Sequence, residues 1–272
     1  MCALEQRVRQ RSSARSSGLI ALRTPPVFEL DWTGERPLTT LRDLIPSRAR
    51  ARLRPLLRAR PRWGNLRRSA PFSDRYGYDR GTPVDRYFIE QFLDQNRADV
   101  RGSVAEIKSS KYTDAFGGTH VSERHVIDID SENPAATIVA DLAARGSLPT
   151  GAFDCFILTQ TLHLLSDPSA GLANAYQSLR PGGRLLVTVP SIARVDPDIG
   201  DTDLWRFTPA GLFSLISSSC ERAEVDVAPY GSLVTAVAFL EGLAAEELAE
   251  EELRHNDPSF VVLCCGRIAA PS

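Results

Sequence analysis

Several polar side chains of this sequence stand where buried apolar segments end, and such positions can hold a small ligand. Asp130 follows one apolar segment, while Thr159, Gln160 and His163 follow another. A carboxylate, a hydroxyl and an amide can hydrogen-bond to a ligand, and an imidazole can take a proton from a hydroxyl group. Open α/β sheets bind ligands at the carboxyl ends of their strands. These four residues are therefore the first candidates for a binding site.

The segments that must position these residues are buried strands. Their apolar content is nearly continuous rather than alternating, which indicates a central parallel sheet covered on both faces. We expect seven strands: Ser103–Ile107, His125–Ile129, Thr137–Leu142, Phe153–Leu158, Arg184–Val189, one around Ala223–Ala228, and Phe260–Ile268.

Helix signals separate several of these strands. Thr82 is predicted to be a helix N-cap, with Pro83 at the first helical position and Asp85 completing a capping box. A second helix is expected to start at Asp167-Pro168 and to end at Pro181-Gly182-Gly183. Further helices are expected from Thr208-Pro209 and over the insertion Leu233–Glu252.

The charge is distributed unevenly along the chain. Residues 1–70 hold 16 Arg, no Lys and 5 acidic residues, a net charge of +11, whereas the other 202 residues carry −13. We therefore expect a basic, loosely ordered arm over 1–70 and a folded domain over 71–272. The arm could touch RNA, an anionic membrane surface or an acidic partner, but it lacks the interleaved aromatic residues that single-strand binders use.

Cysteine usage and hydropathy favour a cytoplasmic protein. The five cysteines form no C-x-x-C pair, and three lie in or beside apolar strands. No apolar run reaches the roughly 20 residues of a membrane span. The four histidines are scattered, so we propose no metal site.

A set of motifs in the same order resembles the class I S-adenosylmethionine-dependent methyltransferase superfamily, and within it a branch of small methyltransferase-domain proteins. The resemblance covers roughly residues 63–268. The motifs are YDRGTPVDRY (Tyr78 to Tyr87), YTDAFGG (Tyr112 to Gly118), ATIVADL (Ala136 to Leu142), LTQTLHLL (Leu158 to Leu165), LRPGGRLLVTVP (Leu179 to Pro190), WRFT (Trp205 to Thr208) and AVAFLEGLAAEEL (Ala236 to Leu248).

The resemblance implies a Rossmann-like, doubly wound, seven-stranded sheet whose last strand is antiparallel, with S-adenosylmethionine as cofactor. A carboxylate at the end of the second strand can accept hydrogen bonds from both ribose hydroxyls, and Asp130 stands in that place. The alternative is that Asp130 caps the next segment. Asp141 resembles the acid near the adenine amino group, with helix capping as its alternative. Thr159 and Gln160 would contact the cofactor at the end of the fourth strand.

The first loop departs from the superfamily pattern E-x-G-x-G-x-G. It reads Glu106-Ile107-Lys108-Ser109-Ser110-Lys111-Tyr112 and has no glycine before Gly117. Two outcomes follow for Lys108. Its side chain either turns outward and pairs with the cofactor carboxylate, or it fills the site and opposes the positively charged sulfonium.

Methyl transfer depends mainly on holding the acceptor close and aligned, and a base helps when the acceptor is a hydroxyl. His163 is the candidate base, although its Leu-His-Leu-Leu context also suits a packed helix histidine. Tyr230 is the second catalytic candidate, because with Asp203 and Arg206 it is expected to flank the mouth of the site.

Three functions remain open at this stage. The first is methyl transfer to a small-molecule acceptor such as a sugar or secondary metabolite. The second is a methyltransferase-like binding or partner subunit that has lost the cofactor, which Lys108 and the missing glycines favour. Nucleic-acid binding by the Arg-rich arm is the one we favour least, since the folded domain is acidic. The sequence leaves the oligomeric state open.

Overall fold

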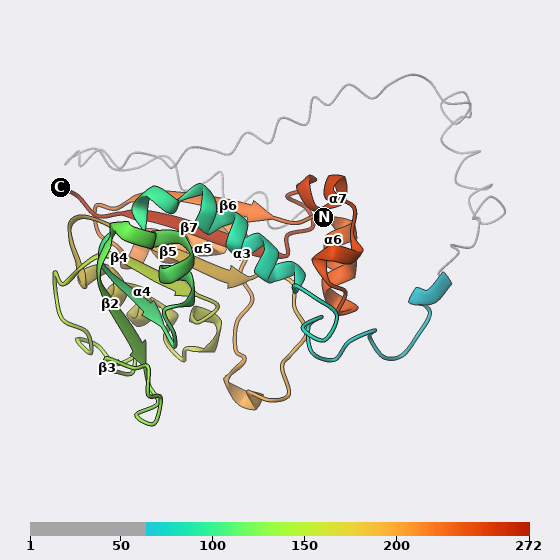
Figure 1. Cartoon of the computed structure of the whole chain (residues 1–272), viewed down its shortest axis with the longest axis horizontal. Helices are drawn as coiled ribbons and strands as arrows, with labels where there is room; N and C mark the ends of the chain where they lie inside the picture. The colour runs from blue at the N-terminus through green and yellow to red at the C-terminus, as the bar shows by residue number, and fades with distance from the viewer. Residues whose placement is uncertain (1–63) are drawn as a thin grey trace, which may run out of the picture. The chain divides into compact units, whose positions relative to one another are not determined.

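The computed structural model describes residues 64–272, which form one compact unit from Gly64 to Ser272. Figure 1 shows this unit. Most of the predicted basic arm, residues 1–63, lies outside the described residues. The proposed domain boundary after residue 70 therefore stays a prediction.

Seven strands form one mixed sheet in the order β3-β2-β1-β4-β5-β7-β6. Strands β1 to β5 pair in parallel, and β7 runs antiparallel to both of its neighbours. The predicted doubly wound sheet with an antiparallel last strand is thereby confirmed. The strands are β1 (Gly102–Ile107), β2 (Val121–Asp128), β3 (Ile138–Val139), β4 (Phe153–Thr159), β5 (Leu179–Pro190), β6 (Glu224–Tyr230) and β7 (Leu263–Ala269).

Helices cover both faces of this sheet. Helices α3 (Val84–Gln95) and α6 (Leu233–Leu240) pack on one face, and Figure 1 shows α3 crossing the strands. Helices α4 (Pro168–Gln177) and α5 (Pro209–Ser219) pack on the other. The sheet is therefore enclosed between two apolar layers.

Strand β4 shows why its apolar run is continuous. Cys155 and Ile157 face the layer of α3 and α6, whereas Phe156 and Leu158 face the layer of α4 and α5. All four side chains are fully buried. Both sides of the strand must therefore be apolar, as in other central parallel strands.

The connection from β1 to β2 is shaped by Glu106. This described segment makes one π-helical turn, η3 (Thr113–Gly117), and one 3-10 turn, η4 (Gly118–His120). The buried Glu106 carboxylate accepts the backbone N–H of Tyr112 at 3.0 Å and of Thr113 at 2.7 Å. These bonds satisfy donors at the start of the turn, so Glu106 fixes the loop that leaves β1.

Two predicted helix ends need correction. Pro83, not Thr82, occupies the N-cap of α3, and no side chain caps this helix. The predicted capping box is wrong because the backbone N–H and hydroxyl of Thr82 donate to Glu246, at 2.9 and 2.7 Å. Helix α4 starts as predicted, with Asp167 accepting the N–H of Ala170 at 3.0 Å. It ends at Gln177 rather than at the Pro-Gly-Gly sequence, since β5 already begins at Leu179.

The predicted helical insertion is broken into α6, η7 (Ala245–Glu247) and α7 (Glu250–Arg254). A strap, defined as residues 72–82, lies against it. The N–H groups of Phe72 and Ser73 donate to the Glu241 carbonyl, at 2.8 and 3.2 Å. Gly242 follows with φ +69°, and a Cβ at this position would lie 2.3 Å from the Ser73 carbonyl oxygen. Only glycine permits this close approach.

Candidate functional site

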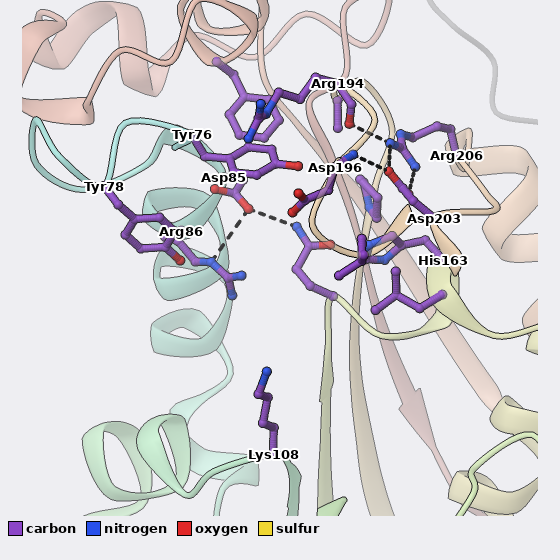
Figure 2. A pocket seen from close by; sticks show the side chains of 16 residues that line it. Tyr76, Tyr78, Asp85, Arg86, Lys108, His163, Arg194, Asp196, Asp203 and Arg206 are labelled. Atoms are coloured by element: carbon purple, nitrogen blue, oxygen red, sulfur yellow. Dashed lines mark hydrogen bonds and ion pairs between the residues drawn. The ribbon is translucent and has the colours of Figure 1, made fainter. Parts of the chain in front are cut away.

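A cavity of about 290 Å³ opens at the carboxyl edge of the sheet. Its walls come from the residues that follow β1, β4 and β5, from α3 and from the strap, as Figure 2 shows. Open α/β sheets bind ligands in this place. The charged and polar lining residues are Tyr76, Tyr78, Asp85, Arg86, Lys108, Gln160, His163, Arg194, Asp196, Asp203 and Arg206.

Unsatisfied polar atoms concentrate in this cavity. Among the described residues, seven buried side-chain nitrogen or oxygen atoms have no hydrogen-bond partner. Four of the seven belong to residues of the cavity wall: Arg86 Nε, Gln160 Oε1, His163 Nδ1 and Arg194 Nε. Buried polar groups in folded proteins are nearly always paired, so this concentration indicates a site that a ligand completes.

Lys108 has a backbone conformation that suits glycine. Its φ is +71°, in the left-handed region that side chains disfavour. Its N–H donates to the Ile127 carbonyl at 2.9 Å, and its carbonyl accepts from Asn133 Nδ2 at 2.9 Å. Figure 2 shows its side chain directed toward the cavity. The Lys108 ammonium group is therefore part of the cavity lining.

Gln160 links β4 to helix α3. It also has a left-handed backbone, with φ +46°, and its Nε2 donates to Asp85 Oδ2 at 3.1 Å. Arg86 Nε lies 3.8 Å from the same oxygen. Burial raises the pKa of Asp85, although the Arg86 charge and the Gln160 hydrogen bond act against this shift. One carboxylate thus holds an amide and a guanidinium in the cavity wall.

His163 is neutral at physiological pH. Burial lowers its pKa to about 4, although the charge of Asp203 acts against this shift. Its Nδ1 is buried without a partner, while its carbonyl accepts the N–H groups of Leu204 at 3.0 Å and Trp205 at 3.1 Å. The ring can therefore accept or donate one hydrogen bond to a ligand, but it is a weak base.

The loop of residues 191–206 is held by Arg206. Its guanidinium forms a two-armed pair with Asp203, with Nη2 2.7 Å from Oδ2, and donates to the Arg194 carbonyl at 2.8 Å. Asp203 also accepts the N–H of Asp196 at 3.1 Å. This network fixes the backbone that carries Arg194, as two-armed guanidinium pairs do. Asp203 and Arg206 line the cavity as expected.

Asp130 lies just beyond the end of β2 and is exposed. One oxygen, Oδ1, accepts the N–H of Glu132 at 2.9 Å, and Oδ2 has no partner among the described residues. Asn133 joins this loop to the first one, since its Nδ2 donates to Asp128 Oδ2 at 2.6 Å and to the Lys108 carbonyl. Asp130 is thus both a turn former and a free acceptor at the sheet edge.

The remaining predicted site residues do not line the cavity. The Asp141 carboxylate accepts the N–H of Ala143 at 2.9 Å in a turn after the short strand β3. Thr159 pairs with β5. Glu106 is buried beneath the first loop. Tyr230 is buried, and its hydroxyl donates to Gln95 Oε1 at 2.8 Å, so the structure does not place it at the mouth.

Of the eight predicted site residues, the cavity therefore brings together Lys108, Gln160 and His163. Sequence reasoning did not propose six other polar residues of its wall: Tyr76, Tyr78, Asp85, Arg86, Arg194 and Asp196. Asp85 and Arg86 belong to the motif YDRGTPVDRY, but their spacing was interpreted as a helix start. The sequence signal that could have identified them is a pair of consecutive charged residues, one acidic and one basic, on an otherwise apolar helix face.

The fold and the cavity of this protein agree with the resemblance that the sequence motifs indicate. Its strand order, its antiparallel β7 and a site at the carboxyl edge of β1, β4 and β5 are those implied by the class I S-adenosylmethionine-dependent methyltransferase superfamily.

Comparison with known proteins finds one family model that matches part of the chain. Residues 95–187 match the family model described as "Methyltransferase domain". This part of the chain therefore resembles a methyltransferase domain. No curated protein matches the sequence.

Solved structures similar to this chain have low sequence identity. The cyclase SpnF is 14% identical with a TM-score of 0.48, over 71% of this chain and 83% of that one. An S-adenosylmethionine-dependent methyltransferase from Mesorhizobium loti is 17% identical with a TM-score of 0.44, over 71% and 100%. One from Archaeoglobus fulgidus is 15% identical with a TM-score of 0.44, over 68% and 93%.

The residues at the sheet edge fit the cofactor that this family implies. The free Oδ2 of Asp130 is the acceptor that ribose hydroxyls require, and Lys108 has the left-handed backbone that suits the glycine of the superfamily pattern. The ammonium of Lys108 suits a carboxylate and opposes a sulfonium. Fit therefore requires that the carboxylate end of the cofactor lie nearer to Lys108 than the sulfonium does.

Residues 64–272 contain neither a membrane-spanning helix nor a cluster of metal-binding side chains. No helix there is long and apolar enough to cross a membrane. This part of the chain also holds no group of three or more His, Cys, Asp or Glu side chains that could bind a metal ion.

Proposed function

We propose that this protein transfers a methyl group from S-adenosylmethionine to a small-molecule acceptor, a sugar or a secondary metabolite. The observation that carries the proposal is the concentration of four unpaired buried polar atoms in one cavity at the carboxyl edge of a methyltransferase sheet. Bound there, the cofactor would supply an electrophilic methyl group. The protein's own residues must then hold two ligands in alignment.

In this proposal, Asp130 accepts hydrogen bonds from the ribose and Asp141 lies toward the adenine. Lys108 and Gln160 face the amino-acid end, with Thr159 beside them at the end of β4, and Glu106 acts indirectly by shaping the first loop. The support is positional, since these residues follow β1, β2, β3 and β4 at one edge of the sheet.

The acceptor would lie farther into the cavity, beside His163, Tyr76 and Arg194. With a pKa of about 4, neutral His163 can accept a hydrogen bond from a substrate hydroxyl and orient it. It would remove a proton only weakly. We therefore assign His163 mainly to positioning, and we do not carry Tyr230 into the catalytic group, because its hydroxyl is already bound to Gln95.

Transfer is tested by following the formation of S-adenosylhomocysteine in the presence of sugars and small metabolites. We expect formation that depends on both the protein and one class of acceptor. The matched variant Asp130→Asn should raise KM for S-adenosylmethionine. Conversion that is equal with and without every acceptor would count against transfer.

A second candidate function is a binding or partner subunit without the cofactor. Lys108 favours it, because its ammonium group enters the cavity where the superfamily has glycine. The two functions differ in one property, which is whether S-adenosylhomocysteine binds.

A cytoplasmic location also remains part of the proposal. The four described cysteines are free and buried, as expected of thiols kept in a reducing compartment.

A further inference from the structure

The cavity wall contains charged side chains that do not pair with one another. It contains four cations, Arg86, Lys108, Arg194 and Arg206, and three carboxylates, Asp85, Asp196 and Asp203. Arg206 is neutralised by its two-armed pair with Asp203, and Arg86 lies 3.8 Å from Asp85. Arg194 and Lys108 form no ion pair with a carboxylate among the described residues.

Arg194 is positioned as a ligand-binding group. Its guanidinium lies over the Tyr76 ring, 4.2 Å from the ring centre, and this cation–π contact restrains the guanidinium plane. Its Nε is buried without an acceptor. Its backbone is fixed because its carbonyl accepts from Arg206 at 2.8 Å. A buried guanidinium donor without an acceptor is costly, so the arrangement favours a ligand that supplies oxygen atoms.

Tyr76, beside Arg194, can also donate to such a ligand. Burial and the charge of Asp196 raise the pKa of Tyr76 to about 12, so its phenol keeps its proton and can donate a hydrogen bond. Asp196 is the one lining carboxylate without an ion pair among the described residues, and its Oδ1 accepts the N–H of Asp198 at 3.0 Å. Arg194 and Lys108 lie toward opposite ends of the view in Figure 2.

We propose that the cavity binds an anionic small molecule, whose carboxylate or phosphate group pairs with Arg194. A guanidinium edge presents two parallel N–H donors that match two oxygens of either group. Lys108, which follows β1, remains for the carboxylate of the cofactor. This inference deepens the proposed function by naming the chemical class of the acceptor. It rests on the proposed function only in treating the bound anion as the methyl acceptor.

Calorimetric titration tests this proposal with four probes: glucuronate, glucose 6-phosphate, inorganic phosphate and neutral glucose. Ionic strength is matched with chloride, and each titration is repeated with saturating S-adenosylhomocysteine. We expect binding of at least one anionic probe, no binding of glucose, and no displacement by S-adenosylhomocysteine. Preference for glucuronate identifies a carboxylate ligand, and preference for the phosphates identifies a phosphate ligand.

Variants assign the binding to Arg194. Arg194→Gln should weaken binding of the anionic probe about tenfold or more, since it removes a charge-assisted pair. Arg194→Lys, which keeps the charge but not the two-armed geometry, should weaken it less and guards against a folding defect in the first variant. Arg254→Gln, on the exposed helix α7, is the control and should leave binding unchanged.

The outcomes separate this inference from the proposed function. Absence of binding by every anionic probe, equal binding of glucose, undiminished binding in both Arg194 variants, or displacement by S-adenosylhomocysteine overturns the inference. If an anion binds in a way that depends on Arg194 but S-adenosylhomocysteine does not bind, the inference is supported and the proposed methyltransferase function is contradicted. If S-adenosylhomocysteine binds but no anionic probe does, the proposed function is supported and the inference is overturned.

Discussion

Lys108 carries a side chain at a backbone position that suits glycine, with φ +71°. We expect Lys108→Gly to raise the free energy of unfolding by about 0.5–1 kcal/mol, because relief of the left-handed strain exceeds the entropy that glycine loses on folding. Chemical denaturation of the variant and the parent protein measures this difference.

Lys108→Ala is the matched control, since it removes the ammonium group but keeps a Cβ in the left-handed region. It should gain little or no stability. If alanine and glycine stabilise the protein equally, the strain lies in the charge of Lys108 and our account of the backbone is wrong.

His163 makes stability depend on pH in a defined window. Its pKa in the folded protein is about 4, below the ordinary value of 6.5, so the unfolded chain binds the proton more readily. The contribution of neutral His163 is complete above pH 6.5 and is lost as the pH falls through 4. Its upper limit is about 3 kcal/mol.

His163→Gln isolates this contribution, because every other titrating group is retained. As the pH falls from 6.5 to 4, the unfolding free energy of the parent should decrease more than that of the variant. A difference that stays constant over this range would mean that His163 titrates normally and is open to water.

At the scale of elements, the strap is held by its close contact with the insertion at Gly242. Gly242→Ala should destabilise the protein by at least about 2 kcal/mol. The new Cβ would clash with the Ser73 carbonyl oxygen, and alanine is also disfavoured at a positive φ. Hydrogen exchange of residues 72–82 should accelerate, because the strap would detach from Glu241.

Gly200→Ala is the control for backbone conformation. Gly200 has φ +52°, and a Cβ there meets nothing within 4 Å. This variant should lose only about 1 kcal/mol and leave exchange of the strap unchanged. Equal effects of the two substitutions would show that contact with Ser73 is unimportant.

The elements that the sequence predicted best are those whose burial dictates their composition. The run Phe153–Leu158 is apolar on both faces because helices cover both, and Asp167 caps α4 through a local bond that spacing alone reveals. The cavity wall could not be predicted in this way. Arg194 and Tyr76 lie in aperiodic segments and meet only through tertiary packing, and the pairing of Asp85 with Gln160 joins residues 75 positions apart.

At the scale of the whole molecule, the proposed function depends on one edge of the sheet. The residues after β1 and β2 are tied together by Asn133, and those after β4 and β5 form the cavity wall. In the proposed function, the first pair of loops holds the cofactor together with Thr159 and Gln160 at the end of β4. The residues farther along from β4 and β5 hold the acceptor. Residues 95–187, which match the methyltransferase domain, contribute the first pair and the end of β4, whereas the strap and the loop of residues 191–206 lie outside that match.

The most direct test of this account is calorimetric titration of the protein with S-adenosylhomocysteine. We predict one site per chain, affinity weakened about tenfold or more by Asp130→Asn, and affinity retained in Arg194→Gln, which lies on the acceptor side of the cavity. Absence of binding in both the parent protein and Lys108→Gly would contradict the account, and the protein would then be a methyltransferase fold that serves only to bind.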